Sequence, residues 1–172
     1  MNETWARPST PWPGVTTPVL QEAGVLSLVN NSFLAPSAPV YNARDPDVLA
    51  IGGNGTRLWV AGSDSAVAEF NLTSLAFVRW FPVGGLPTGL VSDPTDNTLV
   101  VPLNGSSSAL FLNASTGALV RNVTLPAPAA GGCYVAAAGE VYLASPTTNT
   151  VFGLYASNET IRSVIPVGTA PV

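Results

Sequence analysis

Short apolar segments alternate with polar turn sequences along most of the chain, and the pattern recurs at a fixed spacing. From Phe70 to Leu112 to Leu154 the step is 42 residues each time. The segments that share this period are residues 46–86, 87–127 and 128–170. The apolar runs are rich in Val and Leu, and Gly, Pro, Asn and Ser separate them, which favours short strands over helices.

Each repeat contains about four runs of strand length. The innermost strands are predicted at 48–51, 89–92 and 133–136, the second at 57–61, 98–102 and 140–144, the third at 66–70, 108–112 and 150–154, and the fourth at 77–81, 119–123 and 161–165. Apolar residues dominate both faces of the inner strands, as expected for sheets that pack face to face. A four-stranded repeat of this length is typical of a propeller blade. The sequence therefore predicts an all-β fold, a β-propeller with three complete blades of about 42 residues.

An incomplete copy of the repeat precedes these three blades. Residues 24–29 and 32–35 match the last two strands of a unit, which predicts a partial blade over about 24–45. Residues 1–20 are rich in proline and are expected to form a tail or the start of this partial blade. The propeller repeats are thus assigned to residues 21–172.

Three and a half units do not obviously close a ring, because closed propellers have roughly four to eight blades. Three interpretations remain open. Residues 1–45 complete a fourth blade, two copies close a ring by self-association, or the chain is a piece of a longer protein. We favour the last of these.

The junctions between repeats carry the most distinctive motifs. Phe81–Gly89 reads FPVGGLPTG and Val164–Pro171 reads VIPVGTAP. These segments resemble the blade junction of the YVTN-type β-propeller repeat family, and Leu99–Pro102 stands where that family has its YVTN tetrad. The resemblance covers about residues 24–172. It implies the propeller fold and a similarity to cell-surface and surface-layer proteins of archaea. It does not indicate an activity.

Sequons for N-glycosylation are unusually dense in this sequence. Eight Asn-x-Ser/Thr triplets occur in which x is not proline, whereas composition alone would place roughly two. They begin at Asn2, Asn30, Asn54, Asn71, Asn104, Asn113, Asn122 and Asn158. The excess predicts covalent N-glycans and hence an extracellular or cell-surface location. Alternatively, Asn, Ser and Thr coincide because all three favour turns.

Four of the sequons share a predicted position. Asn30, Asn71, Asn113 and Asn158 are all expected in the turn between the third and fourth strands of their unit. Sugars on this turn would emerge at the same outer corner of every blade.

Charge excludes some partners. The chain has ten acidic residues, six arginines and neither lysine nor histidine, for a net charge of -4. Nucleic acid is not an expected partner, because binding it requires a basic surface. A membrane span is not expected either, because no apolar run approaches about 18 residues.

The inventory of reactive side chains is small. The lack of His and Lys rules out histidine-dependent nucleophilic triads, Schiff bases and histidine metal sites. Cys133 is the only cysteine, and its apolar context predicts a small buried core residue. Three arginines, Arg79, Arg121 and Arg162, recur at equivalent positions of the fourth strands and are expected on a solvated face.

Aspartates remain as the candidates for acid–base chemistry. They cluster at strand ends and comprise Asp45, Asp47, Asp64, Asp93 and Asp96. Two suitably spaced carboxylates could hydrolyse a glycoside, and several could bind Ca²⁺, but no calcium-loop pattern is present. Asp93–Asn97 is a turn sequence, in which aspartate commonly accepts hydrogen bonds from its own backbone. We therefore interpret these aspartates as turn residues and expect no cofactor.

Two functions are therefore expected in order of preference. The first is a non-catalytic extracellular or cell-surface glycoprotein that acts as a scaffold, adhesion or interaction module for protein or surface-glycan partners. The alternative is a carbohydrate-active enzyme, a glycosidase or lyase, that uses an Asp pair and requires two carboxylates to converge on the propeller axis.

Overall fold

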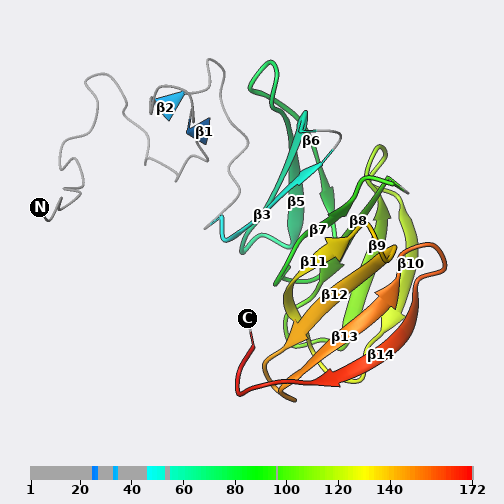
Figure 1. Cartoon of the computed structure of the whole chain (residues 1–172). Coiled ribbons are helices and arrows are strands. Elements are labelled where there is room, and N and C mark those ends of the chain that lie inside the picture. Colours follow the sequence, from blue (N-terminus) through cyan, green and yellow to red (C-terminus); the bar gives the residue numbers. More distant parts are fainter. Residues whose placement is uncertain (1–24, 27–32, 35–45, 53–54, 96, 172) are drawn as a thin grey trace, which may run out of the picture.

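The fold is all-β and built from stacked four-stranded sheets (Figure 1). A computed structural model describes residues 25–26, 33–34, 46–52, 55–95 and 97–171. Within these residues every regular element is a strand. None of the described residues form a helix that is long and apolar enough to cross a membrane.

Three antiparallel sheets follow one another along the chain, and we name them blades A, B and C. Blade A consists of β3 (Val48–Gly52), β4 (Arg57–Ala61), β5 (Ala66–Asn71) and β6 (Ala76–Pro82). Blade B consists of β7 (Val91–Asp93), β8 (Thr98–Pro102), β9 (Ser108–Asn113) and β10 (Leu119–Thr124). Blade C consists of β11 (Ala130–Val135), β12 (Glu140–Ser145), β13 (Thr150–Tyr155) and β14 (Thr160–Pro166). The predicted propeller fold and its three complete blades are confirmed.

A short antiparallel pair precedes blade A. It joins β1 (Val25–Leu26) to β2 (Phe33–Leu34), within the two strands predicted for the partial blade. The other residues before Pro46 lie outside the described part of the chain. The predicted tail at 1–20 and the extent of the partial blade therefore stay predictions.

Two of the three innermost strands differ from their predicted positions, whereas β3 begins at the predicted Val48. Strand β7 begins at Val91, whereas β11 begins at Ala130, three residues before the predicted start. The early start of β11 follows from Gly131, whose φ of +60° is accessible to glycine and which falls at a register shift in the β11–β12 pairing. The amide of Gly131 donates to the carbonyl of Thr88 at 3.0 Å, which ties β11 to the junction before blade B.

The hydrophobic core lies between the blades. Trp59 and Phe81 of blade A pack with Leu99 and Leu110 of blade B in one buried cluster. A second cluster joins blades B and C, with Phe111 and Val141 fully buried in it. Neighbouring residues of a strand point to opposite faces, so Leu99 faces blade A while Val100 faces blade C. The inner strands β3, β7 and β11 also contact their neighbours, which places them toward a common axis.

Cys133 is exposed, so the prediction of a buried core residue is wrong. It lies on β11 opposite Tyr142 of β12. The residues next to it, Gly132 and Tyr134, lie on the face of blade C that packs against blade B. Alternation along the strand therefore turns Cys133 to the other, uncovered face.

Candidate functional site

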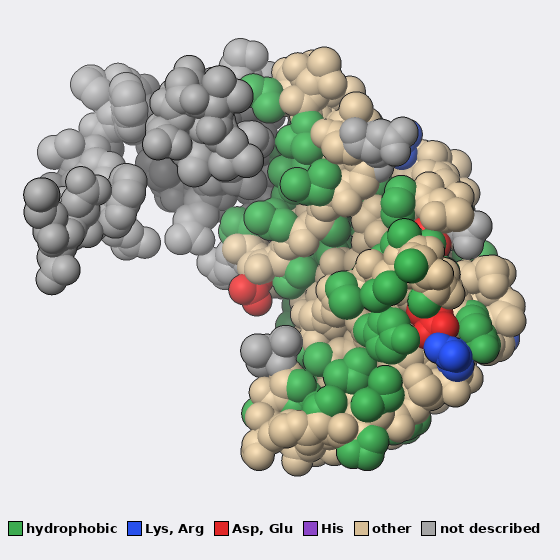
Figure 2. Space-filling view, in the orientation of Figure 1, with side chains coloured by type: hydrophobic (Ala, Val, Ile, Leu, Met, Phe, Trp, Pro, Cys, Tyr) green, Lys and Arg blue, Asp and Glu red, His purple; other side chains and the backbone are tan. Residues whose placement is uncertain are grey.

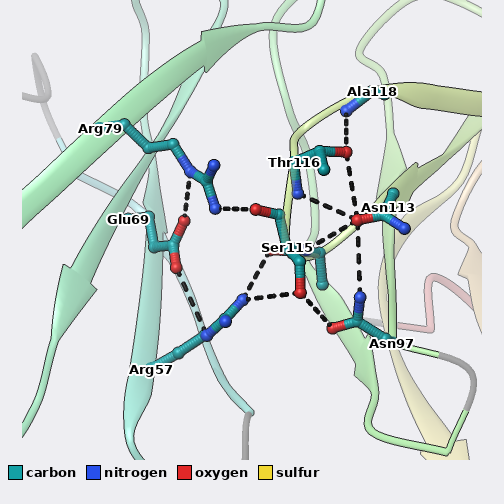
Figure 3. Close-up of polar contacts among 9 residues, drawn as sticks. Arg57, Glu69, Arg79, Asn97, Asn113, Ser115, Thr116 and Ala118 are labelled. Carbon is teal, nitrogen blue, oxygen red and sulfur yellow. Dashed lines mark hydrogen bonds and ion pairs between the residues drawn. The ribbon is translucent and has the colours of Figure 1, made fainter.

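The most developed polar site of the described chain crosses from blade A to blade B (Figure 3). Its centre is Glu69 on β5, whose side chain is only 3% exposed although it lies on a largely apolar face. Arg79 Nε donates to Glu69 Oε2 at 2.7 Å, and Arg57 Nε lies 3.6 Å from Oε1. A buried carboxylate requires such partners because its desolvation is otherwise costly.

Both arginines continue past Glu69 to the β9–β10 turn of blade B. Arg57 Nη1 donates to the carbonyl of Ala114 at 3.1 Å and to Ser115 Oγ at 3.3 Å. Arg79 Nη2 donates to the carbonyl of Ser115. Carbonyls at a turn need donors when a neighbouring sheet partly covers them. We call this set of contacts from Arg57 and Arg79 to the next blade the arginine clamp.

The turn that receives the clamp is itself held in one conformation. The side-chain oxygen of Asn113 accepts from the amides of Ser115 and Thr116, each at 3.0 Å. Gly117 has a φ of +76°, and a Cβ added there would lie 2.7 Å from the Phe81 ring of blade A. The turn thus combines an Asx turn with a glycine that permits close approach of the neighbouring blade.

A related contact joins blade B to blade C. Arg121 of β10 donates through Nη1 to the carbonyl of Asn158 at 3.1 Å and lies 3.6 Å from Glu159 Oε2. Both acceptors belong to the β13–β14 turn. In each case an arginine of the fourth strand reaches the corresponding turn of the following blade. The side chains of Arg79 and Arg121 are 36% and 52% exposed, as expected on a solvated face, but they also extend across the gap between sheets.

Blade C carries a polar cluster on its uncovered face. Glu140 is buried, with 4% of its side chain exposed, and accepts from Arg162 Nη1 at 2.5 Å. The Tyr142 hydroxyl donates to the other carboxylate oxygen at 2.7 Å. Arg162 Cζ lies 5.7 Å from the centroid of the Tyr155 ring, within the range of a cation–π contact.

Arg162 is not equivalent to Arg79 and Arg121, which corrects the alignment made from sequence. Strand pairing places Glu69 opposite Arg79, Phe111 opposite Arg121 and Gly153 opposite Ser163. Arg162 instead lies one residue earlier, at the bulge of the fourth strand. It reaches Glu140 from the bulge, whereas Arg79 reaches Glu69 from the regular part of the strand.

Hydrogen bonds set the ionisation of this cluster. The bond from the Tyr142 hydroxyl, and then that from Arg162, hold the pKa of Glu140 below its ordinary value of 4.5. The same bond raises the pKa of Tyr142, because donation to a carboxylate favours the protonated phenol. Glu140 also raises the pKa of Arg162. The cluster is thus a stable arrangement of an anion and a cation at neutral pH.

We expect the contribution of Glu140 to stability to disappear in acid. Because its pKa is lower in the folded than in the unfolded chain, its ionisation stabilises the fold above the ordinary pKa, and this is lost as pH falls through the folded value. The melting temperature of Glu140→Gln should therefore lie below that of the unmodified protein at about pH 7 and approach it at about pH 3. Thermal melts across this range check it, and a difference that grows on acidification would contradict it.

Tyr142→Phe provides the matched variant. It keeps the carboxylate but removes the largest cause of the lowered pKa of Glu140. Its pH-dependent loss of stability in acid should therefore be smaller than in the unmodified protein and should be complete at a higher pH.

The structure places five of the eight predicted sequon asparagines among the described residues. Asn71, Asn104, Asn122 and Asn158 are exposed, whereas Asn113 is half-buried. Asn2, Asn30 and Asn54 lie outside the described residues. Four of these five asparagines are therefore exposed enough to carry a glycan.

The sequons of the outer turns are not all in register. Asn71 and Asn113 each end the third strand of their blade. Tyr155 holds that place in blade C, and Asn158 follows three residues later in the same turn. The side-chain oxygens of Asn71, Asn113 and Asn158 all accept amides within their turns. Of these three, only Asn158 thus lies in the predicted turn itself, whereas Asn71 and Asn113 share the last position of the third strand and contact the turn through their side chains.

The described aspartates do not assemble into one site. Asp93 accepts the amide of Thr95 at 2.8 Å, which agrees with a turn role. It ends β7, whereas Asp47 precedes β3 and Asp64 lies between β4 and β5. Since strands alternate in direction, Asp93 lies at the opposite end of the blades from Asp47 and Asp64. Asp45 and Asp96 lie outside the described residues.

An open hollow of about 560 Å³ lies at the end of the blades that carries Asp47. Ser63, Thr88 and Asn104 also line it, and Asp47 is the one carboxylate among the described residues of its lining. Glycoside hydrolysis generally requires two carboxylates about the scissile bond. Among the described residues no group of three or more His, Cys, Asp and Glu could hold a metal ion.

Comparison with known proteins identifies the architecture. No protein-family model matches the sequence, and no curated protein matches it either. Among solved structures, hydrazine synthase of Kuenenia stuttgartiensis is similar with a TM-score of 0.68 at 11% identity, over 81% of this chain and 41% of that one. The chain has a β-propeller fold.

Repeat proteins of other kinds share this propeller fold. The WD40 repeats of RRP9 are similar with a TM-score of 0.64 at 11% identity, over 71% of this chain and 38% of that chain. A chain of the mitotic checkpoint complex gives a TM-score of 0.68 at 12% identity, over 82% and 43%. This propeller chain therefore spans about two fifths of the length of the solved chains it matches. Structural similarity at such low sequence identity establishes the fold alone. The function has to be argued from the residues of the site.

Proposed function

We propose that the chain is a non-catalytic propeller segment of an extracellular glycoprotein and serves as an interaction scaffold. The exposure of Asn71, Asn104, Asn122 and Asn158 carries the proposal. Turn chemistry explains Asn71 and Asn158, whose oxygens accept turn amides. It does not explain Asn122, which lies within the outer strand β10. A sequon on an exposed strand is better explained by a glycan than by turn composition.

The scaffold role is supported by the way the blades are joined. The arginine clamp and the contacts of Arg121 fix each blade to the next, so the stack presents rigid turns and faces to a partner. The hollow beside Asp47 does not by itself favour hydrolysis, because the described residues of its lining supply a single carboxylate. Partners of such a scaffold would be proteins or surface glycans.

We further propose kinship with YVTN-type surface propellers. The motif valines Val83 and Val167 follow the fourth strands of blades A and C, and Leu125 does so in blade B. The amides of all three donate to the turn before the third strand of their own blade, to Ser65, Asn149 and Ser107 respectively, at 2.8–3.0 Å. The residue after the fourth strand thus makes the same hydrogen bond in every blade. This repeated structural role of the junction motif supports a relationship to the YVTN-type repeat family.

Glycopeptide mapping of the protein purified from its source tests the proposal. We expect sugar on Asn122 and Asn104, and an intact mass above 17.6 kDa that falls on chemical deglycosylation. Asn97 is the control, because it is exposed but Asn97-Thr98-Leu99 is not a sequon. Unmodified asparagines at all sequons would overturn the glycoprotein proposal and leave the turn interpretation.

A further inference from the structure

The hollow beside Asp47 has a sequon asparagine in its wall. The start of blade A, the β4–β5 turn, the junction before blade B and the first residue of β11 line it. Asn104, in the β8–β9 turn, also lines it and is exposed. Its volume of about 560 Å³ falls within the range of roughly 300–1,000 Å³ typical of small-ligand sites. A sugar on Asn104 would therefore begin at the wall of a hollow large enough to hold it.

The junction between blades B and C is closed by a threonine. The amide of Thr88 donates to the carbonyl of Pro102 at 2.9 Å, and its hydroxyl donates to the carbonyl of Ala129 at 2.7 Å, directly before β11. The amide of Gly131 donates in return to the carbonyl of Thr88 at 3.0 Å. The hydroxyl of Thr88 is thus the side-chain donor that ties blade B to blade C.

Asp47 holds the place of Thr88 in blade A. Its amide donates to the carbonyl of Ala61 at 3.0 Å, as that of Thr88 does to the last residue of the second strand in blade B. By the same repeat, Pro87 corresponds to Ala129. An ionised carboxylate only accepts hydrogen bonds, so Asp47 cannot donate to the carbonyl of Pro87 as Thr88 donates to Ala129. An acceptor therefore replaces the donor at the junction where the hollow lies.

The lining of the hollow matches the chemistry of a sugar. Sugar hydroxyls both donate and accept hydrogen bonds, so they can donate to the Asp47 carboxylate and pair with the Ser63 hydroxyl. Leu86, Pro87 and Ala130 supply apolar surface for the C–H groups of the ring. Figure 2 shows an acidic group at the start of blade A, apart from the basic groups of that view.

The sugar would reach the hollow without a separate binding step. The amide of Asn104 donates to the carbonyl of Leu86 at 2.7 Å, which holds the β8–β9 turn against the junction before blade B. A glycan linked to Asn104 is thus attached at a fixed point of the wall. Such a short tether gives an effective concentration on the order of millimolar, so weak contacts suffice to seat the sugar.

We propose that the first sugar of a glycan on Asn104 occupies the hollow and joins blade A to blade B there. A sugar hydroxyl donates to the Asp47 carboxylate and supplies the donor that Thr88 supplies at the next junction. The inference rests on the proposed glycosylation and gives one of the glycans a structural role. It also implies that the chain's own sugar, and not a free ligand, fills this hollow.

Two substitutions that remove single sequons test the proposal. Ser106→Ala removes the sequon of Asn104 and Thr124→Ala that of Asn122, on the outer strand β10, and neither changes the asparagine. In glycosylated protein, we expect Ser106→Ala to lower the melting temperature by about 2–4 °C and Thr124→Ala by less than about 1 °C. In protein produced without glycans, Ser106→Ala should cost no more than Thr124→Ala. Glycopeptide mapping establishes which asparagines carry sugar in each preparation.

Asp47→Ala tests the contact itself. In glycosylated protein it should lower the melting temperature as Ser106→Ala does, and the double variant should lose no more than Ser106→Ala alone. Without glycans, Asp47→Ala should not reproduce the loss. A sugar on Asn104 whose removal leaves the melting temperature unchanged, or sugar on Asn122 but not on Asn104, would overturn this inference alone. Unmodified asparagines at all sequons would overturn the proposed glycoprotein together with it.

Discussion

Replacing Phe111 by alanine is expected to lower the free energy of unfolding by about 3–5 kcal/mol. The ring is fully buried on β9 and packs in the cluster between blades B and C. Its removal leaves a cavity lined by two different sheets, which cannot easily collapse because each is held by its own strand pairing. Urea unfolding monitored by circular dichroism measures the effect.

Leu119→Ala is the matched control for this cavity. Leu119 is also an apolar residue of blade B, but 58% of it is exposed. We expect its replacement to change stability by about 0.5 kcal/mol or less. Equal losses in the two variants would show that the core between blades B and C does not hold the stack together.

Glu69→Gln is expected to cost about 2–3 kcal/mol, the second largest effect. The substitution keeps the size of the side chain but removes the charge that holds Arg57 and Arg79. Both guanidinium groups then lose the partner that aims them at Ala114 and Ser115, so the connection between blades A and B weakens as well.

Glu159→Gln serves as the control for the clamp. Glu159 also pairs with an arginine of the preceding blade, but at 3.6 Å and with 52% of the Arg121 side chain exposed. Ion pairs of this kind contribute about 1 kcal/mol or less. Chemical denaturation of both variants under one condition compares them, and a loss at Glu159 equal to that at Glu69 would contradict a special role for the buried carboxylate.

The sequence predicts the outer three strands of each blade well, for a physical reason. Their apolar residues recur with the 42-residue period, and polar turn sequences separate them in every repeat. The innermost strands lack this regularity. The start of β11 depends on a glycine at positive φ and on its hydrogen bond to Thr88 of another blade, which no local pattern specifies.

The clamp could not be predicted as a site from periodicity alone. An arginine at a repeated strand position is compatible with a solvated face, and only the packing of neighbouring blades shows that Arg79 reaches Ser115. One signal was available in Glu69, because a charged residue within the apolar run of β5 requires a partner of opposite charge. The sequence likewise could not assign Arg162 to a bulge, since bulges are set by strand pairing.

Because the core lies between the blades, no blade has a complete core of its own. Stability should therefore be distributed as in a linear array, with each sheet dependent on its nearest neighbours. Blade B is buried on both sides, whereas Val135 and Ile165, on the face of blade C away from blade B, are 38% and 41% exposed. Under mechanical tension, or in hydrogen exchange, blade B should therefore be the last of the three described blades to open, because it is held from both sides.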